Sequence, residues 1–150
     1  MRLERIKTKE HNEASQILTD YWRSRGMSYS KAWTKKYLKE GHKTEIRQDI
    51  IFAIKEKRKL CGIISAIVLE GNVAELRDFV IKKEFQGKGY GTKAVNQVLT
   101  WCKKRKIRKV VALCCPATKR ITQKLGFIKE GLLKDHFVKG ESLTIMSKFP

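Results

Sequence analysis

The sequence is short of acidic residues, of proline and of long apolar runs. It has 15 Asp and Glu against 34 Lys and Arg, and only two prolines. No stretch approaches the roughly 20 apolar residues that a membrane-spanning helix needs, so we expect no membrane association. Charged residues interrupt every early apolar run, which argues against a signal peptide. We therefore expect a cytoplasmic protein.

Patterns typical of metal sites and of hydrolases are also missing. Cys61, Cys102, Cys114 and Cys115 include no Cys-x-x-Cys pair, so we expect no metal site. In a reducing compartment such residues are typically free thiols in the core. No arrangement of serine, histidine and acid indicates a hydrolase, and we expect His136 at the surface or at the rim of a groove.

The excess of basic residues gives a net charge of +19 over 150 residues. Such a charge predicts attraction to polyanions and to anionic ligands. Charge is nearly continuous over Lys103–Lys106 and at Arg108 and Lys109. Two interpretations stay open at this stage: a solvated basic surface, or a surface that contacts RNA or the ribosome.

The chain length and the lack of linkers, repeats or low-complexity segments predict one domain over residues 1–150. Alternating and continuous apolar runs predict strands, and apolar residues at helical spacing predict helices. The expected strands are Met1–Lys7, Asp49–Lys55, Leu60–Leu69, Val73–Ile81, Val110–Cys114, Phe127–Leu133 and Leu143–Lys148. The expected helices run from Thr8 to a stop at Gly26, from a cap at Ser28 or Ser30 to Gly41, through Ala94–Cys102, and over Ala117–Leu125.

The first two predicted helices are rich in aromatic residues. Tyr21, Trp22, Trp33 and Tyr37 recur at helical spacing together with aliphatic residues. We expect these rings in the core. The alternative is that some of them border a substrate groove.

A glycine-rich stretch follows the strand Val73–Ile81. It reads Gln86-Gly87-Lys88-Gly89-Tyr90-Gly91 and opens an amphipathic helix. A strand, a glycine-rich turn and a helix N-terminus form an anion site, because backbone N–H groups converge there and the helix dipole adds positive potential. The spacing fits neither a P-loop, which needs a Lys-Ser/Thr pair, nor a dinucleotide fingerprint, since the third glycine is misplaced.

The pattern Gln-x-x-Gly-x-Gly between a strand and a helix resembles the pyrophosphate loop of the GNAT superfamily of N-acetyltransferases. A second segment, Thr122–Gly131, resembles the family's next conserved region, and the order of predicted elements is similar over nearly the whole chain. The resemblance implies an α/β (α+β) fold. Its sheet would be mixed and mostly antiparallel, splayed between its two central parallel strands, with helices on both faces.

The same resemblance implies that acetyl-CoA is the co-substrate. Pantetheine would lie along Phe79, Val80 and Ile81, where the strand splays from its neighbour. The pyrophosphate would bind in the loop formed by Gln86, Gly87, Lys88, Gly89, Tyr90, Gly91 and Thr92. The reaction would be direct acyl transfer to a primary amine in a ternary complex, with a backbone N–H stabilising the oxyanion.

Glu75 is our candidate for the catalytic base. It stands where certain lysine acetyltransferases of the superfamily carry a glutamate. The simpler interpretation is a surface glutamate paired with Arg77. Asp78 is the second candidate, although strand alternation points it to the opposite face unless a bulge intervenes.

The usual thiolate donor is absent. Most members of the family have a tyrosine where this chain has Thr122. Cys114 or Cys115 could supply a proton instead, because a thiol and the departing coenzyme have similar pKa values. Water is the remaining alternative, and two structural thiols are the simplest one.

The acceptor cannot be named from these patterns. It could be a small amine, a protein N-terminus, a lysine or an aminoacyl-tRNA. The basic surface favours an acceptor that is itself anionic or that lies on the ribosome or tRNA, and it disfavours a polycation such as spermidine, which it would repel. The alternative function is an RNA- or ribosome-binding protein on the same fold with little or no turnover. We expect a monomer or a homodimer.

Overall fold

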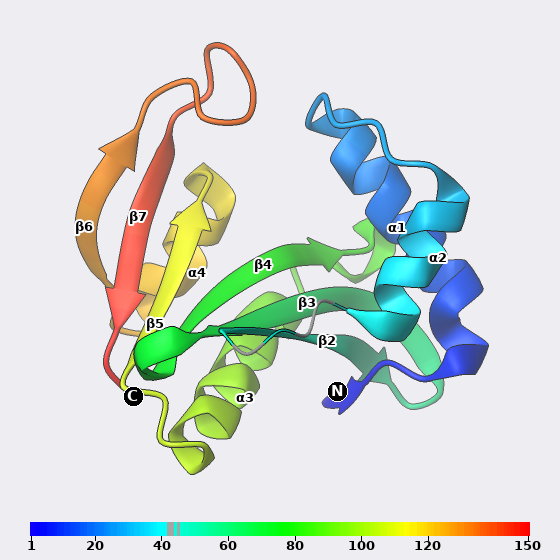
Figure 1. Ribbon diagram of the computed structural model, residues 1–150, viewed down its shortest axis with the longest axis horizontal. Coiled ribbons are helices and arrows are strands. Elements are labelled where there is room, and N and C mark those ends of the chain that lie inside the picture. Colours follow the sequence, from blue (N-terminus) through cyan, green and yellow to red (C-terminus); the bar gives the residue numbers. More distant parts are fainter. Residues whose placement is uncertain (42–43, 45) are drawn as a thin grey trace.

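The computed structural model describes residues 1–41, 44 and 46–150. Among these residues the chain forms a seven-stranded sheet with four α-helices around it (Figure 1). The strands are β1 (Arg2–Arg5), β2 (Arg47–Glu56), β3 (Lys59–Leu69), β4 (Val73–Ile81), β5 (Lys109–Cys114), β6 (Ile128–Leu133) and β7 (Leu143–Lys148). The helices are α1 (His11–Ser24), α2 (Lys31–Glu40), α3 (Tyr90–Lys104) and α4 (Pro116–Lys124), with short 3₁₀ turns at Thr8–Glu10, Glu70–Asn72 and Lys83–Phe85.

The strands lie in the order β1-β2-β3-β4-β5-β7-β6. Only β4 and β5 run parallel, and the other neighbours are antiparallel. The α3 crossover connects the parallel pair, as a parallel connection requires. The predicted mixed, mostly antiparallel sheet with helices on both faces is therefore confirmed.

The parallel pair separates part of the way along. Backbone pairing between β4 and β5 covers only Val73–Leu76 and Lys109–Ala112. Beyond these residues the two strands diverge, which Figure 1 shows as a V between the β2–β4 half and the β5–β7 half of the sheet. The predicted splay is confirmed by this loss of pairing.

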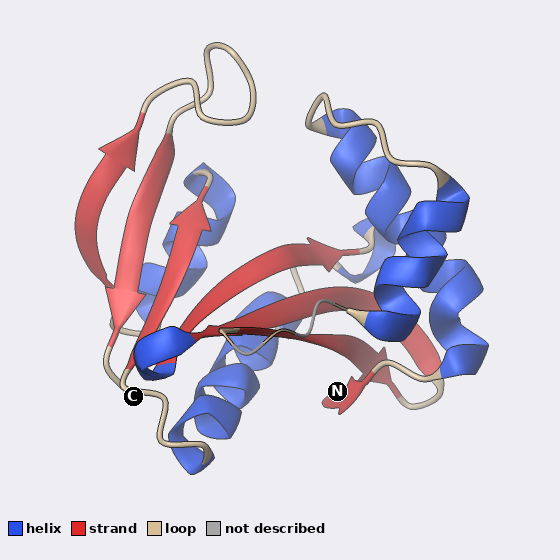
Figure 2. Ribbon diagram, viewed as in Figure 1, coloured by secondary structure: helices blue, strands red, loops and turns tan. Residues whose placement is uncertain are grey.

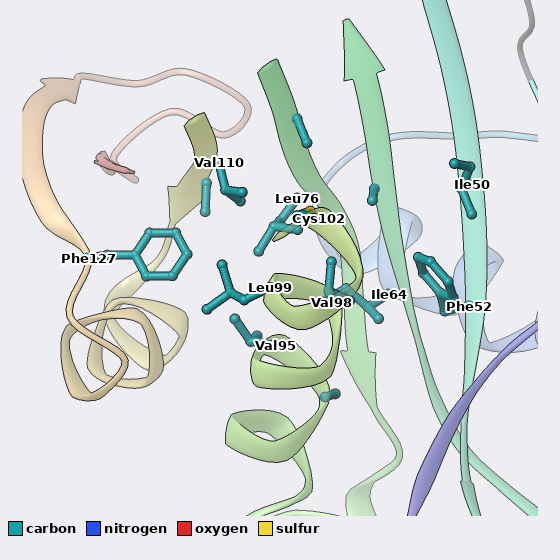
Figure 3. Packing of buried hydrophobic residues seen from close by; sticks show 14 of the residues in the cluster. Ile50, Phe52, Ile64, Leu76, Val95, Val98, Leu99, Cys102, Val110 and Phe127 are labelled. Atoms are coloured by element: carbon teal, nitrogen blue, oxygen red, sulfur yellow. The ribbon is translucent and has the colours of Figure 1, made fainter. Parts of the chain in front are cut away.

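Helix α3 covers one face of the sheet. Its apolar stripe packs on every second residue of the strands, because strand side chains alternate between the two faces (Figure 3). Each fully buried Val or Leu of this kind stabilises the fold by ~1.5–3 kcal/mol. The stripe consists of Ala94, Val95, Val98, Leu99 and Cys102, and the strand residues beneath it include Phe52, Ile64, Leu76 and Val110.

Helices α1 and α2 cover the other face of β2–β4 (Figure 2). They pack on the alternate strand residues, which include Ile51, Ala53 and Ile63. Ser30 begins α2, since its side chain accepts a hydrogen bond from the Trp33 amide at 3.1 Å. This N-cap satisfies one amide of the first helical turn.

Strand β4 contains a bulge. Ile63 pairs with Val80 and Ser65 pairs with Arg77, so Asp78 and Phe79 together oppose the single residue Ile64. Asp78 has the left-handed φ of +46°. The bulge turns the Asp78 side chain toward α1 and α2, onto the same face as Arg77. The position expected from simple alternation was therefore wrong, and the conditional expectation of a bulge was right.

The remaining sequence predictions differ from the structure mainly at element ends. Strand β2 extends two residues further toward the N-terminus than Asp49, and α4 begins at Pro116, whose fixed φ suits the first turn of a helix. None of the helices in the described part of the chain is long and apolar enough to cross a membrane.

Candidate functional site

The glycine-rich loop joins β4 to the N-terminus of α3. Gly87 and Gly89 have φ values of +74° and +76°, which other residues adopt at a cost. A β-carbon at either position would meet nothing within 4 Å, so the loop borders open space. Within the described residues, no side chain caps α3, which leaves the first amides of the helix available to an anion.

Gly91 has a different role in the same loop. A β-carbon there would lie 2.9 Å from Ile121 Cδ1 and 3.1 Å from Phe79 Cζ. A side chain at position 91 would therefore require the Ile121 side chain to shift. Glycine lets the N-terminus of α3 lie close to Phe79, in the part of β4 that no longer pairs with β5.

The polar side chains of the loop hold it in place. Gln86 donates from Nε2 to the Ile81 carbonyl at 2.9 Å, and Lys88 Nζ lies 5.6 Å from the centre of the Phe85 ring. A hydrogen bond to Glu56 raises the pKa of Tyr90 to about 12. Gln86 and Lys88 are exposed, while Val80, Ile81, Tyr90 and Thr92 are partly buried. Of the ten residues predicted to bind the cofactor, three thus lie at the end of β4, four in the loop and three at the start of α3.

A cavity of about 410 Å³ passes through the gap between β4 and β5. This volume is typical of ligand pockets. Its walls come from both faces of the sheet: Trp22 and Tyr37 lie on the α1–α2 side, and Val95 and Thr122 lie on the α3–α4 side. The cavity therefore lies at the gap, in contact with side chains from both faces of the sheet.

The predicted base, Glu75, lines this cavity on β4. Its side chain is 16% exposed and accepts a hydrogen bond from Arg77 Nε at 2.7 Å. The expected Glu75–Arg77 pair is confirmed. The pairing does not remove the carboxylate from the cavity, because both residues line it.

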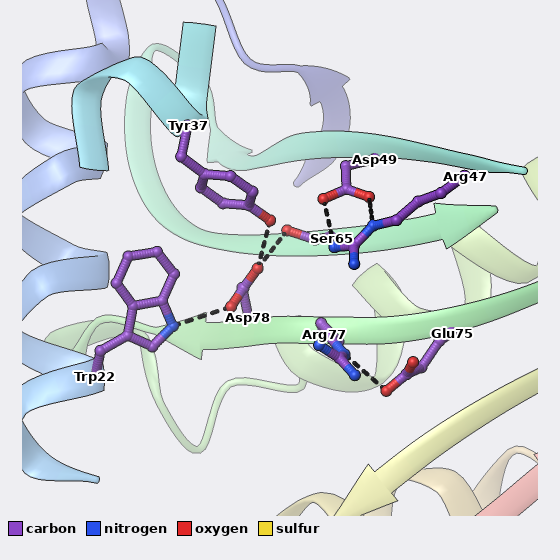
Figure 4. A network of polar contacts seen from close by, with 8 residues as sticks. All are labelled: Trp22, Tyr37, Arg47, Asp49, Ser65, Glu75, Arg77 and Asp78. Atoms are coloured by element: carbon purple, nitrogen blue, oxygen red, sulfur yellow. Dashed lines mark hydrogen bonds and ion pairs between the residues drawn. The ribbon is translucent and has the colours of Figure 1, made fainter. Parts of the chain in front are cut away.

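Asp78 lies at the centre of a hydrogen-bonded network on the same wall (Figure 4). Trp22 Nε1 donates to Oδ1 at 3.0 Å, while the Tyr37 hydroxyl donates to Oδ2 at 2.8 Å. The Ser65 hydroxyl also donates to Oδ2, at 3.1 Å. Burial, followed by the nearby charge of Asp78, raises the pKa of Tyr37 well above its usual value.

Two further ion pairs belong to the site and were missed from the sequence. Arg47 binds both carboxylate oxygens of Asp49, at 2.8 and 2.9 Å. Arg25 contacts Glu141 at 2.5 Å and joins the end of α1 to the segment before β7. The Arg25–Glu141 partners are 116 residues apart, so no local pattern predicts the contact.

The aromatic residues of α1, α2 and their connection form one wall of the cavity. Tyr29, Trp33 and Tyr37 stack with ring centres 4.6 and 5.6 Å apart, and Trp22 packs edge-on or tilted against all three. Trp22 and Tyr37 are buried, as expected for core residues. Trp33 is 40% exposed and lines the cavity, so the core interpretation was wrong for this residue.

The cavity is also lined by Thr122, Cys114 and Cys115, the three positions considered above for a proton donor. Thr122 is buried, and its hydroxyl donates to the Lys119 carbonyl at 2.9 Å. Burial raises the pKa of the Cys114 thiol. Burial also opposes ionisation of Cys115, but hydrogen bonds from Thr118 and Ala117 outweigh it and lower its pKa.

The four cysteines are free thiols, as predicted. Cys61, Cys102 and Cys114 are buried, whereas Cys115 is partly exposed and faces the cavity. The expectation of a buried structural thiol was therefore wrong for Cys115. His136 is exposed in the β6–β7 connection, as expected. No group of three or more potential metal ligands occurs in the ranges 1–41 and 46–150 or at residue 44.

Comparisons with known proteins agree on one family. Residues 12–127 match the acetyltransferase (GNAT) family. A protein of Pyropia yezoensis described as an uncharacterized N-acetyltransferase, ycf52, is 30% identical over 105 residues, which are 67% of this chain and 60% of that protein. The chain thus spans less than two thirds of the length of that relative.

Solved structures of similar fold are more distant in sequence. Spermidine N-acetyltransferase from Vibrio cholerae, in complex with CoA and spermine, superposes with a TM-score of 0.83 at 18% identity, over 99% of this chain and 94% of that one. An acetyl transferase from Salmonella typhimurium that modifies the N-terminal serine of ribosomal protein L7/L12 has a TM-score of 0.81 at 16% identity, with coverage of 99% and 94%. With its splayed parallel strands, its glycine-rich loop and a family match over most of its length, this chain belongs to the acetyltransferase (GNAT) family.

Proposed function

We propose that the protein is an N-acetyltransferase that moves the acetyl group of acetyl-CoA to a primary amine by direct attack in a ternary complex. The continuity of the cavity through the gap between β4 and β5 carries this proposal. It lets a thioester and an amine approach one point from opposite faces of the sheet, which removes much of the entropic barrier to their reaction.

The cofactor would occupy the side of the gap next to the loop. The pyrophosphate would accept hydrogen bonds from the amides between Gln86 and Thr92, where Gly87 and Gly89 border open space. The pantetheine would pair with backbone groups of Phe79, Val80 and Ile81, which β5 leaves unpaired. One of these amides would also stabilise the oxyanion of the tetrahedral intermediate.

Glu75 would remove the proton that the amine loses as the C–N bond forms, directly or through water. Its position on the cavity wall supports this role, and Asp78 is the alternative acceptor on the same wall. The departing thiolate takes up a proton as the C–S bond breaks. Cys115, which is partly exposed to the cavity, or a water molecule would supply that proton.

The proposal is tested by measuring CoA release from acetyl-CoA with a panel of primary amines, peptide N-termini, lysine peptides and aminoacyl-tRNA. We expect release that depends on one class of acceptor and yields the acetylated amine by mass spectrometry. If acetyl-CoA binds but no acceptor raises CoA release above background hydrolysis, direct transfer to an amine is not the function.

A second candidate function is contact with RNA or the ribosome through the basic surface. The observation that favours it is the row of exposed cations at the end of α3, Lys103–Lys106. Affinity for RNA should fall linearly with salt on logarithmic axes as counterions are released, and replacing Lys103, Lys104 and Lys106 by Gln should lower the slope. If micromolar protein does not bind at about 50 mM salt, this candidate is wrong.

A further inference from the structure

Among the described residues that line the cavity, one acid has no basic partner. Each of the three arginines that line it, Arg25, Arg47 and Arg77, is held by an acidic partner. Among the residues that the structure describes, Asp78 takes part in no ion pair, and its three donors are a neutral indole and two neutral hydroxyls. In a chain of net charge +19, this wall of the cavity therefore carries one uncompensated negative charge.

The Asp78 carboxylate also has room for a further donor. A carboxylate offers about four acceptor positions, and three of them are occupied here. In the described part of the chain, Oδ1 accepts a hydrogen bond only from Trp22, while Oδ2 accepts the other two. An ammonium group at Oδ1 would complete the set with a charge-assisted hydrogen bond.

The surroundings of Asp78 are flat and apolar. The stacked rings of Tyr29, Trp33 and Tyr37 lie next to Asp78, to which Tyr37 is hydrogen-bonded. The Trp22 ring packs edge-on against Tyr29 of this stack. Tyr29 and Trp33 are 41% and 40% exposed, so part of this aromatic surface is open to a ligand. The rings support one another, and a ligand that packs on them orders few additional side chains.

We infer that the acceptor is a singly charged primary amine attached to an apolar, preferably planar, body, with its ammonium bound at Asp78 and its body on the aromatic wall. This inference rests on the proposed function and specifies its substrate class. A second cationic group on the acceptor would find no further unpaired acid among the described residues that line the cavity, and the net charge of +19 would repel it. Polyamines are therefore poor acceptors.

This chemistry has two sources: a free arylalkylamine, or the N-terminus of a peptide that begins with an aromatic residue. Two probes separate them. One is 2-phenylethylamine, and the other is the dipeptide amide Phe-Ala-NH₂, whose only charge is its N-terminal ammonium. Tighter binding of one probe identifies the source, and binding of either one supports the inference.

The test is calorimetric titration of these probes, and of spermidine, into protein saturated with CoA, which cannot acetylate them. We expect at least one probe to bind about tenfold or more tightly than spermidine. Asp78→Asn should lower the affinity for that probe at least about tenfold, which is the usual effect of losing a hydrogen bond to a charged group. Asp20→Asn is the matched control, because Asp20 is exposed on α1 and pairs with Arg23. It makes the same change in total charge and should leave the affinity unchanged.

Trp33→Ala gives a second variant, which removes none of the three donors to Asp78. The substitution should lower the affinity for 2-phenylethylamine more than the affinity for ethylamine, since only 2-phenylethylamine has a ring that can pack on the aromatic wall. Equal affinity for spermidine and both probes, or unchanged probe affinity in Asp78→Asn, overturns the inference. A separate titration with CoA alone distinguishes the two failures: loss of CoA binding counts against the proposed function, whereas loss of amine selectivity counts only against this inference.

Discussion

The indole nitrogen of Trp22 donates a 3.0 Å hydrogen bond to Asp78, and this contact joins α1 to the bulge of β4. The Tyr37 hydroxyl makes the corresponding contact from α2, at 2.8 Å. One carboxylate thus holds both helices against the strand that borders the gap. The aromatic wall and the acid of the cavity are consequently kept at a constant separation.

Tyr37→Phe should lower the free energy of unfolding. The substitution removes only the hydroxyl that donates to Asp78, and hydrogen bonds to charged groups contribute about 1.5–3 kcal/mol. Urea denaturation measures the change. Tyr29→Phe is the matched control, because Tyr29 is 41% exposed and its loss of a hydroxyl should change stability by less than about 0.5 kcal/mol. Equal effects of the two substitutions would show that the hydrogen bond from Tyr37 to Asp78 contributes nothing measurable to stability.

Gly89→Glu should abolish the stabilisation of the protein by acetyl-CoA. The wild-type melting temperature should rise more with acetyl-CoA than with acetate or ATP, because a ligand specific for the native state shifts unfolding. The variant places a negative side chain in the open space of the loop and strains a left-handed backbone. Gly140→Glu is the control, since Gly140 has a similar φ of +86° and equally open surroundings but lies between β6 and β7. If acetyl-CoA raised the melting temperature of Gly89→Glu as much as that of the wild type, the loop would not be part of the cofactor site.

Glu75→Gln should lower kcat by roughly a hundredfold or more, the usual contribution of a general base. The defect should shrink near pH 9, where more of the free amine is already deprotonated. Binding of acetyl-CoA should hardly change, because Glu75 precedes the residues proposed to hold pantetheine. The measurements are turnover at neutral pH and near pH 9, and coenzyme affinity.

Wild-type turnover in Glu75→Gln would transfer the role of base to Asp78 or to a water relay. Loss of coenzyme binding would instead assign Glu75 a structural role through its contact with Arg77.

Cys115 should react with iodoacetamide faster than the other three cysteines between pH 7 and 8. Its lowered pKa gives it a larger thiolate fraction there, and it is partly exposed, whereas the others are buried. Thr118→Val removes a hydroxyl 3.4 Å from the thiol, so it should raise the pKa of Cys115 and slow its labelling. Thr100→Val is the control, because Thr100 is exposed on α3, and it should change neither the pKa nor the labelling rate of Cys115. Mass spectrometry identifies the labelled peptide, and preferential labelling of Cys114 would contradict the assignment.

The fold was predictable because its signals are local. Each element or turn is indicated by a few neighbouring residues: the apolar runs of the strands, the cap at Ser30 and the glycines around Lys88. The order of these elements along the chain then limits the possible topologies. The splay was also anticipated, through the family resemblance. A periodic pattern alone does not show where two parallel strands stop pairing.

The site was less predictable because it depends on irregularities and on distant contacts. The bulge at Asp78 reverses the face that alternation assigns, and neither neighbour of Asp78 is a glycine or proline that would mark a bulge. Ring exposure depends on where α2 lies over the sheet, so Trp33 and Tyr37 share a helical stripe but differ in exposure. Cys115 directly follows the buried Cys114 at the end of β5. Its exposure therefore depends on the exact residue at which the strand ends.

The short parallel seam has a mechanical consequence. Strands β4 and β5 are joined by backbone pairing over four residues each, and all other strand pairs lie wholly within one half of the molecule. The sheet thus consists of two plates, β1–β4 and β5–β7–β6, that share a short seam, and past that seam β4 and β5 do not pair with each other. A cofactor whose amide groups form hydrogen bonds with the backbone of both β4 and β5 would connect the two plates beyond their direct pairing. Amides from Asp78 to Ile81 should then exchange their hydrogens with solvent more slowly in the coenzyme complex, and the two plates should unfold as one cooperative unit.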